Sequence, residues 1–151
     1  MDEIELPADF KEFFELLNSE KVEYLLVGGF AVALHGYVRS TSDIDAWVAA
    51  TEENAPKVVT VLRRFGFSHD SAKESMFKQE GKVFQIGLPP MRIDLLTKVS
   101  GVDFATAYSR REAKSVGNLT LQVISLEDLR ANKLASGRNK DLADLDNLPE
   151  A

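Results

Sequence analysis

The stretch that decides the fold is "YLLVGGFAVALHGYVRSTSDIDAWV", which covers residues 24–48. It starts as a short apolar run typical of a buried strand, breaks at Gly28 and Gly29, and continues as a short helical segment. It closes on a second apolar run that contains two aspartates, Asp43 and Asp45, one residue apart. Two like charges in an apolar run repel each other and are costly to bury, so their presence there indicates a chemical role.

Asp43 and Asp45 are expected to point to the same side of their strand, because side chains alternate faces, while Ile44 points into the core. Paired carboxylates present oxygen ligands to Mg²⁺ or Mn²⁺, which complete their shells with water and substrate phosphates. A third carboxylate, Asp94, lies inside the apolar segment "MRIDLLT". If that strand pairs beside residues 43–48, three aspartates meet at one edge of the sheet, where they can hold two metal ions for phosphoryl transfer.

Gly28 and Gly29 come at the end of a predicted strand and just before a predicted helix. Glycines there let the backbone approach a ligand closely, and the free N–H groups of the helix suit a phosphate. A cation and hydroxyls that suit the same phosphate come directly before Asp43: Arg39, Ser40, Thr41 and Ser42. Each signal alone has a plainer interpretation, since a Gly-Gly pair is often a simple turn, Asp-x-Asp occurs by chance in loops, and a buried aspartate is often a cap or an ion-pair partner.

The length and composition fit one soluble domain that spans residues 1–151, with 44% hydrophobic and 28% charged residues. No apolar run reaches about 18 residues, so we expect no membrane span and no membrane partner. The acidic start "MDEIELPADF" has neither the basic residues nor the apolar core of a signal peptide. Because cysteine is absent, disulfides and thiolate metal sites are excluded, and a cytoplasmic location is expected.

Charge and histidine content narrow the chemistry. The two histidines, His35 and His69, are too few for a His-rich zinc site, so any metal should be a hard cation held by carboxylates. The net charge of −6 argues against a protein that coats nucleic acid. A nucleotide or RNA substrate is still allowed, because residues 130–140 carry four basic side chains and no acidic one.

The rest of the chain predicts a mixed order of helices and strands, hence an α+β or α/β domain with a mixed central β-sheet flanked by helices. Ser125 and Asp128 have the spacing of a helix-capping pair, and Gly137 is expected to end that helix. Trp47 and the phenylalanines of residues 10–14 are expected in the core. Helices are predicted over residues 7–20, 29–36, 51–66, 125–137 and 139–151, and strands over 22–28, 43–50, 67–70, 75–88, 91–100 and 114–124, the last as a hairpin around Gly117-Asn118.

This order of features resembles the nucleotidyltransferase superfamily of the DNA polymerase beta type. Its mark is a Gly-Gly or Gly-Ser pair, about a dozen residues, then Asp-x-Asp or Asp-x-Glu, and later a third acid on a strand. Here Gly28-Gly29 is followed by 13 residues and Asp43-Ile44-Asp45, with Asp94 as the third acid. The tail "LRANKLASGRNKDLADLDNL" is similar to the Lys-containing helix and R-x-K-D-x-x-D ending of small bacterial and archaeal members, which include nucleotidyltransferase-like toxins of abortive-infection systems. The resemblance spans residues 22–148.

The resemblance implies the nucleotidyltransferase fold and a role for each motif residue. Asp43 and Asp45 would bind both metals, and Asp94 would bind one metal and act as general base toward the attacking hydroxyl. Gly28 and Gly29 would cradle the triphosphate. Weaker candidates for nucleotide contact come from the tail: Lys133, Arg138 and Asp141. Their alternative interpretation is a solvated helix with ion pairs four residues apart, and Asp144 is expected as an exposed partner of Lys140.

The implied reaction transfers a nucleoside monophosphate from a nucleoside triphosphate to an acceptor hydroxyl, with RNA, tRNA or protein favoured as acceptor, in a toxin–antitoxin system. Two alternatives stay open: a catalytically silent nucleotide-binding regulator, and a nucleotidyltransferase for an antibiotic such as an aminoglycoside or lincosamide. The sequence departs from the pattern where many catalytic relatives have Ser in place of Gly29, although Gly-Gly is usual in the toxin-like branch. The helical domain that positions acceptors in larger relatives is absent, so a homodimer or a small partner protein is expected to supply a second wall.

Overall fold

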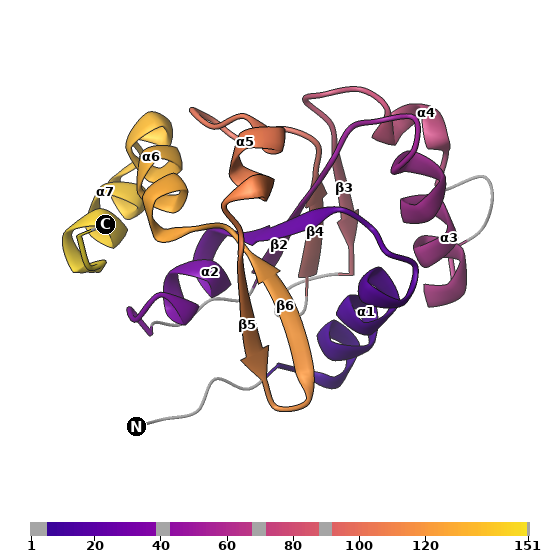
Figure 1. The fold of residues 1–151 in the computed structure, drawn as a ribbon, viewed down its shortest axis with the longest axis horizontal. Helices are drawn as coiled ribbons and strands as arrows, with labels where there is room; N and C mark the ends of the chain where they lie inside the picture. The colour runs from indigo at the N-terminus through magenta and orange to yellow at the C-terminus, as the bar shows by residue number, and fades with distance from the viewer. Residues whose placement is uncertain (1–5, 39–42, 68–71, 88–91, 151) are drawn as a thin grey trace.

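A computed structural model describes residues 6–38, 43–67, 72–87 and 92–150 of the chain. Within these residues one mixed sheet of six strands is surrounded by seven helices (Figure 1), an α+β arrangement as predicted. The helices are α1 (Ala8–Ser19), α2 (Gly28–Leu34), α3 (Ala55–Phe65), α4 (Glu74–Phe77), α5 (Phe104–Ser109), α6 (Leu126–Ser136) and α7 (Asn139–Asn147). The strands are β1 (Tyr24–Val27), β2 (Asp43–Val48), β3 (Val83–Ile86), β4 (Arg92–Leu96), β5 (Glu112–Val116) and β6 (Leu119–Val123).

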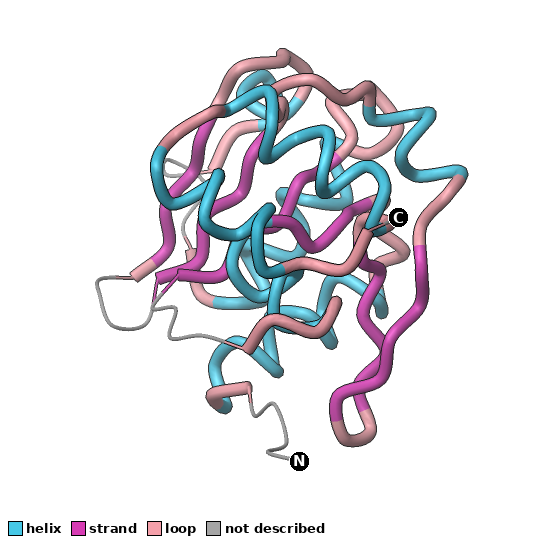
Figure 2. Tube along the Cα trace, turned by 90° about the vertical axis from the view of Figure 1, so that its left-hand side faces the viewer, coloured by secondary structure: helices cyan, strands magenta, loops and turns pink. Residues whose placement is uncertain are grey.

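The sheet has the strand order β3-β4-β2-β1-β6-β5, which puts β2 in the interior between β4 and β1. β2 runs antiparallel to β1 and parallel to β4, and its residues Asp45, Ala46 and Trp47 have register partners on both sides. β6 joins β1 in parallel through the pair Leu26 and Val123, and it forms an antiparallel hairpin with β5. Figures 1 and 2 show the tip of this hairpin extending from the body of the molecule.

The core forms where α1 and α3 cover the sheet with aromatic and aliphatic side chains. Phe13 and Phe14 are fully buried, and the Phe13 ring meets Phe65 of α3 edge to face with 5.2 Å between the ring centroids. Trp47 is 2% exposed and meets Phe104 in the same way at 5.0 Å. Burial of each such ring stabilises the fold by about 2–3 kcal/mol. The prediction that Trp47 and the phenylalanines of α1 lie in the core is confirmed.

Several helix boundaries follow from local signals in the sequence. The Ser125 side chain accepts a hydrogen bond from the backbone N–H of Asp128 at 3.1 Å and caps α6, and Gly137 ends that helix in the left-handed conformation. His35 follows α2, and its Nε2 lies 2.7 Å from the carbonyl oxygen of Ile124, a contact between the end of that helix and the segment after β6.

Two predictions about the elements are wrong and one helix was missed. Residues 75–77, predicted as part of a strand, belong to the short helix α4, and α5 was not predicted. The third helix begins at Ala55 instead of near residue 52, although Thr51 Oγ1 accepts from the Asn54 N–H in the turn before it, the contact expected of the predicted cap. Of the predicted strand 67–70, residues 68–70 lie outside the described residues.

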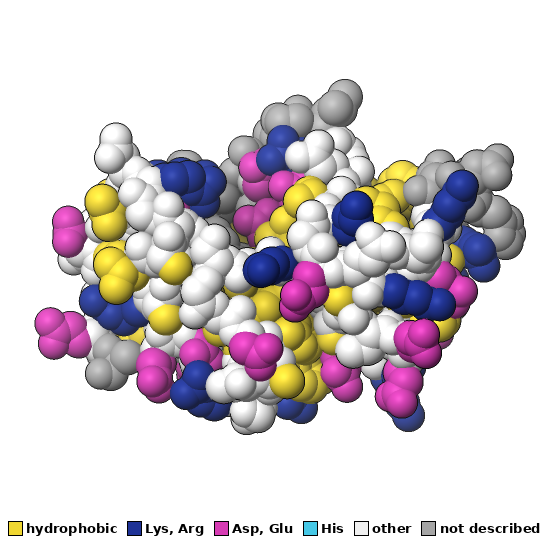
Figure 3. Space-filling model, turned by 90° about the horizontal axis from the view of Figure 1, so that it is seen from above, with side chains coloured by type: hydrophobic (Ala, Val, Ile, Leu, Met, Phe, Trp, Pro, Cys, Tyr) yellow, Lys and Arg dark blue, Asp and Glu magenta, His cyan; other side chains and the backbone are white. Residues whose placement is uncertain are grey.

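The helices of the described residues include none that combines the length and apolar character needed to cross a membrane. On the face seen from above in Figure 3, acidic and basic side chains are interspersed, with apolar side chains between them. The arrangement does not resemble the continuous basic surface of a nucleic-acid-coating protein.

Candidate active site

Asp43, Asp45 and Asp94 lie on one face of the sheet, on two neighbouring parallel strands. Asp45 of β2 is the register partner of Asp94 of β4, and Asp43 is the partner of Arg92. Because side chains two residues apart share a face, these four side chains are neighbours on the same side of the sheet. The strand that carries Asp94 therefore pairs where the sequence predicted, and the three carboxylates meet.

Arg92 is the residue of this group that the sequence analysis missed. Its Nη2 donates to Asp43 Oδ2 at 3.0 Å and to Asp94 Oδ2 at 3.2 Å, and its Nε lies 3.1 Å from Asp94 Oδ1. The guanidinium thus joins the two carboxylates. The signal that could have revealed it is its position two residues before Asp94 in a strand, which puts both side chains on one face.

Asp45 lacks such a partner, since no hydrogen bond or ion pair to its carboxylate is found within the described part of the chain. Burial is the main cause that raises the pKa of Asp45, from 3.8 to about 6, and the nearby charges of Asp94 and Asp43 raise it further. Lys140 and Lys133 act in the opposite direction. A cation bound next to Asp45 would stabilise the ionised form of this carboxyl group.

Asp94 is 8% exposed. Burial raises the pKa of its carboxyl group, while the charge of Arg92 and its hydrogen bond lower it, and the net direction is upward. A carboxylate whose proton affinity is increased in this way can accept a proton from a hydroxyl group more readily than an exposed aspartate.

The donor set fits a hard divalent cation, because carboxylate oxygens are the ligands that Mg²⁺ and Mn²⁺ prefer. The geometry is not ready-made: across residues 6–38, 43–67, 72–87 and 92–150, no three acidic or histidine side chains stand in position to hold one ion. Arg92 engages oxygens of Asp43 and of Asp94. Metal binding at Asp43, Asp45 and Asp94 stays a prediction.

Gly28 brings the backbone against Asp45. It has φ +70°, in the left-handed region, and a Cβ added to it would collide with Asp45 Oδ2. Only glycine lets the chain turn from β1 into α2 at this distance from the carboxylate. The structure thus shows Gly28 close to the acid itself. The close approach to a phosphate that the sequence predicted at Gly28 and Gly29 stays a prediction.

We expect the substitution Gly28→Ala to lower both stability and any activity of the site. The left-handed backbone costs about 1–2 kcal/mol for a residue with a Cβ, and the collision with Asp45 adds to it. Gly117→Ala is the matched control, since Gly117 has φ +60° with nothing within 4 Å of an added Cβ. Urea unfolding should show a larger loss for Gly28→Ala than for Gly117→Ala; equal losses would mean that the contact with Asp45 carries no weight.

A cavity of about 200 Å³ connects this face to the C-terminal helices. It brings together four residues that the sequence predicted as site residues: Gly28, Asp45, Lys133 and Arg138. Its remaining walls come from the ends of β1 and β4, the segment after β4, and α6, namely Val27, Leu96, Lys98, Val99, Ser100, Asn132 and Ser136. Asn132 Nδ2 donates to the Ser100 carbonyl at 2.9 Å and ties the two walls together.

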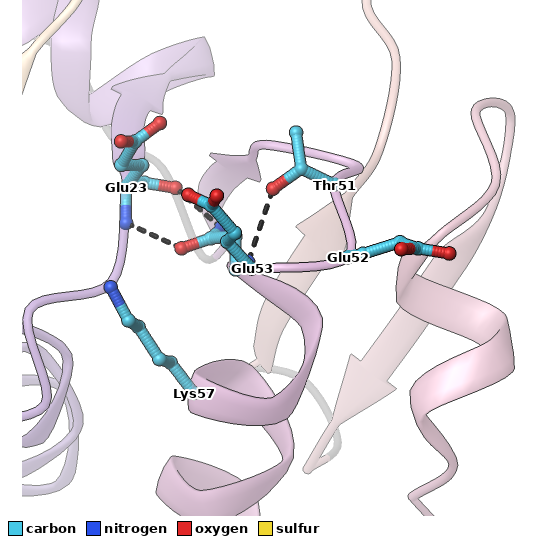
Figure 4. Close-up of a pocket in the computed structure, with 6 residues that line it drawn as sticks. Glu23, Thr51, Glu52, Glu53 and Lys57 are labelled. Carbon is cyan, nitrogen blue, oxygen red and sulfur yellow. Dashed lines mark hydrogen bonds between the residues drawn. The ribbon is translucent and has the colours of Figure 1, made fainter.

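The cavity is not the largest hollow of the described surface. A hollow of about 400 Å³ lies before α3, lined by Glu23, Asn54 and residues 51–53 together with Lys57 (Figure 4). Asn54 is buried there and bonds the Glu23 backbone through both atoms of its amide, at 2.8 and 3.0 Å. None of the three aspartates lines this hollow, so we place the chemistry at the smaller cavity.

Lys133 and Asp141 form a buried ion pair between α6 and α7. Lys133 Nζ lies 3.1 Å from Asp141 Oδ1 and 3.0 Å from Asp144 Oδ2, and all three side chains are at most 5% exposed. The prediction that Asp144 is an exposed partner of Lys140 is wrong, because the turn after Gly137 folds α7 back onto α6 and buries that aspartate. The solvated-helix alternative is wrong for Lys133 and Asp141, which are buried, whereas the Arg138 side chain is exposed and pairs with Asp141 three residues on.

Asp141 also accepts from Arg138, with 2.7 Å between Nε and Oδ2. Burial would raise the pKa of Asp141, but the hydrogen bonds and charges of Arg138 and Lys133 outweigh it and hold the pKa below its ordinary value. With both oxygens engaged inside the protein, Asp141 orients Lys133 and Arg138. Direct contact of Lys133 and Arg138 with a nucleotide stays a prediction. The predicted phosphate ligands Arg39, Ser40 and Thr41, and also Ser42, lie outside the described residues.

Comparison with known protein families tests the resemblance to nucleotidyltransferases. Residues 5–148 match the family described as "Nucleotidyltransferase of unknown function (DUF6036)". The chain belongs to this nucleotidyltransferase family. The match covers nearly the whole chain and includes both the Gly-Gly and Asp-x-Asp segment and the tail. A search among curated proteins found no match to this chain.

Solved structures show the same fold at low sequence identity. A candidate nucleotidyltransferase from Thermotoga maritima is similar over 91% of this chain and 88% of its own, with 18% identity and a TM-score of 0.60. An antigenic nucleotidyltransferase-like protein from Paracoccidioides brasiliensis is similar over 93% of this chain and 75% of its own, with 18% identity and a TM-score of 0.53. The antibiotic-resistance factor ANT(2'')-Ia is similar over 91% of this chain and 79% of its own, with 12% identity and a TM-score of 0.58.

Proposed function

We propose that this nucleotidyltransferase-family protein transfers a nucleoside monophosphate from a nucleoside triphosphate to a hydroxyl group of RNA, tRNA or protein, with Mg²⁺ or Mn²⁺ as cofactor. The observation that carries the proposal is the register of β2 and β4, which brings Asp43, Asp45 and Asp94 together on one face. Burying like charges side by side is unfavourable for a fold alone. It is favourable for a protein that binds cations together with phosphates.

Each residue of the site has a task in the reaction. The backbone at Gly28 and Gly29 receives the phosphates, and Lys98 and Arg138 offset their charge from the cavity wall. Asp94 accepts the proton of the acceptor hydroxyl, whose oxygen forms a bond to the α-phosphorus. The bond between the α-phosphorus and the bridging oxygen breaks, and pyrophosphate leaves. Mg²⁺ or Mn²⁺, held by the three aspartates, would stabilise the charge that develops on the phosphate oxygens.

RNA is favoured as the acceptor because some basic side chains of residues 130–140 are exposed. Arg130 is used inside the fold, where it donates to the carbonyls of Leu145 and Pro149, both at 3.2 Å, and Lys133 is buried. Arg138 and Lys140 stay exposed beside the cavity and suit a polyanion such as an RNA end. The likeness to ANT(2'')-Ia is a likeness of fold, so an antibiotic acceptor is the weaker proposal.

A second candidate is a nucleotide-binding regulator that does not turn over. The observation that favours it is Arg92, which engages Asp43 and Asp94 and leaves no ready-made metal site within the described residues. The resemblance of the tail to toxin nucleotidyltransferases supports a place in a toxin–antitoxin system in the cytoplasm. There, a second copy or a small partner protein would complete the open side of the cavity.

Incubation with each labelled nucleoside triphosphate, Mg²⁺ or Mn²⁺, and total cellular RNA or protein tests the enzyme directly. We expect label in a macromolecule, together with release of pyrophosphate. Saturable binding of the triphosphate without labelled product would identify the regulator. Label in an added aminoglycoside or lincosamide, and in no macromolecule, would move the acceptor to the antibiotic class.

A further inference from the structure

Arg92 joins two carboxylates through a forked set of contacts. Its Nη2 reaches Asp43 Oδ2 at 3.0 Å and Asp94 Oδ2 at 3.2 Å, while its Nε lies 3.1 Å from Asp94 Oδ1. The side chains are 28% exposed for Arg92, 34% for Asp43 and 11% for Asp94. Ion pairs in such a partly water-excluded place are stronger than surface pairs.

The contacts that Arg92 makes are those a divalent ion would need. Both oxygens of Asp94 face the guanidinium, and Asp43 gives it Oδ2. A guanidinium and a metal ion compete for the same carboxylate charge, because each carboxylate has a limited set of lone pairs to share between them. Asp45, the register neighbour of Asp94, takes no part in the fork and keeps its carboxylate toward the cavity that Gly28 also lines.

One contact between Arg92 and Asp94 is weaker than the others. Although Arg92 Nε and Asp94 Oδ1 lie 3.1 Å apart, they form no hydrogen bond, and both atoms are buried without another hydrogen-bond partner. Buried polar atoms without a hydrogen bond are rare in folded proteins because each costs about 1–3 kcal/mol. The fork therefore holds Asp94 less firmly than a fully bonded pair would.

We propose that Arg92 is an internal counter-cation which holds Asp43 and Asp94 together before a divalent ion binds, and which then competes with the ion for these carboxylates. This inference rests on the proposed function, because it assumes that the three aspartates are metal ligands. Arg92 is a positioning residue in this scheme. It prevents repulsion among the carboxylates in the free protein, and it weakens their affinity for the metal alone.

Removal of the guanidinium is the test. For Arg92→Met, titration calorimetry should show Mn²⁺ binding about tenfold tighter than in the unchanged protein, since a competing cation is gone. Arg92→Lys should fall between the two, because an ammonium keeps the charge and loses the fork. Arg64→Met is the matched control, since Arg64 pairs at 2.6 Å with Glu20 on the surface and should leave the affinity unchanged.

Thermal unfolding with and without Mn²⁺ separates this role from a structural one. The free Arg92→Met protein should melt at a lower temperature, and Mn²⁺ should raise its melting temperature by more than it raises that of the unchanged protein. A merely structural arginine would lower both melting temperatures equally. If Arg92→Met fails to fold, Arg92→Gln is used in the same two measurements.

The outcomes are distinct for the two proposals. Mn²⁺ binding that is tighter without Arg92 supports the counter-cation. Mn²⁺ binding that is equal or weaker without Arg92 overturns it and leaves the metal site intact. Absence of Mn²⁺ binding in every variant, with or without a non-hydrolysable triphosphate, overturns the metal site and the counter-cation together.

Discussion

Replacement of Asp45 by Asn is expected to reduce nucleotidyl transfer by at least about 100-fold while the protein stays folded. Loss of one group that stabilises charge in a transition state commonly costs about 10²–10³-fold in rate. Asp45 is the acid best placed for this role, because it lines the cavity beside Gly28 and forms no ion pair within the described residues. Rates of label transfer under saturating Mg²⁺ measure the effect.

The same variant should be more stable than the unchanged protein near neutral pH. Burial and the neighbouring acids raise the pKa of Asp45 from 3.8 to about 6, so the folded state keeps the proton to a higher pH than the unfolded state does. The free energy of unfolding therefore falls as pH rises from about 4 to 6, by at most about 3 kcal/mol. Asn carries no charge, so the gain from Asp45→Asn should be small at pH 4 and reach its full size above pH 7.

Urea unfolding at pH 4.5 and pH 7.5 measures this gain. Asp146→Asn, an exposed change on α7, is the control and should alter neither activity nor stability. Unchanged transfer in Asp45→Asn would contradict the assignment of the site. A gain in stability that does not depend on pH would contradict the electrostatic explanation and leave the catalytic one standing.

Replacement of Lys133 by Met is expected to destabilise the protein by about 3–5 kcal/mol, because it leaves two buried carboxylates without their common cation. Asp141 and Asp144 have side chains that are 1% and 2% exposed, and Lys133 lies within 3.1 Å of both. The loss is a large part of a typical folding free energy of about 5–15 kcal/mol. Denaturation midpoints in urea measure the loss.

Two further variants make this result specific. Lys140→Met removes a neighbouring exposed charge and should cost no more than about 0.5 kcal/mol. The triple variant with Lys133→Met, Asp141→Asn and Asp144→Asn removes all the buried charges and should regain part of the loss. If Lys133→Met alone is as stable as Lys140→Met, the ion cluster is not what holds α7 on α6.

The sequence predicted the part of the site that local patterns encode. Alternation along a strand placed Asp43 and Asp45 on one face, and the buried run around Asp94 indicated an interior strand that could pair beside them. The capping signal at Ser125 gave the start of α6 correctly. Such features depend on neighbours in the sequence, so a single sequence is enough to read them.

Features that depend on tertiary contacts were missed or misread. Asp144 was expected in solvent because its spacing from Lys140 is that of a helical surface pair, whereas packing of α7 on α6 buries it against Lys133. The helix α5 has six residues, too few to show a helical period, although Asp103 caps it with a bond of 3.1 Å to the Thr106 N–H. Arg92 was overlooked because its partners follow from strand pairing across the sheet.

The interior place of β2 in the sheet has a consequence for how fast the site can respond. Asp45 sits on a strand that is hydrogen-bonded to neighbours on both sides, so its backbone has little freedom to adjust when ligands arrive. Rearrangement at the acids is therefore left to side-chain rotation, which takes picoseconds to nanoseconds for a side chain with solvent access, such as Asp43. Rotation of Asp43 should therefore not limit turnover, whereas the buried side chain of Asp94 has less freedom to rotate.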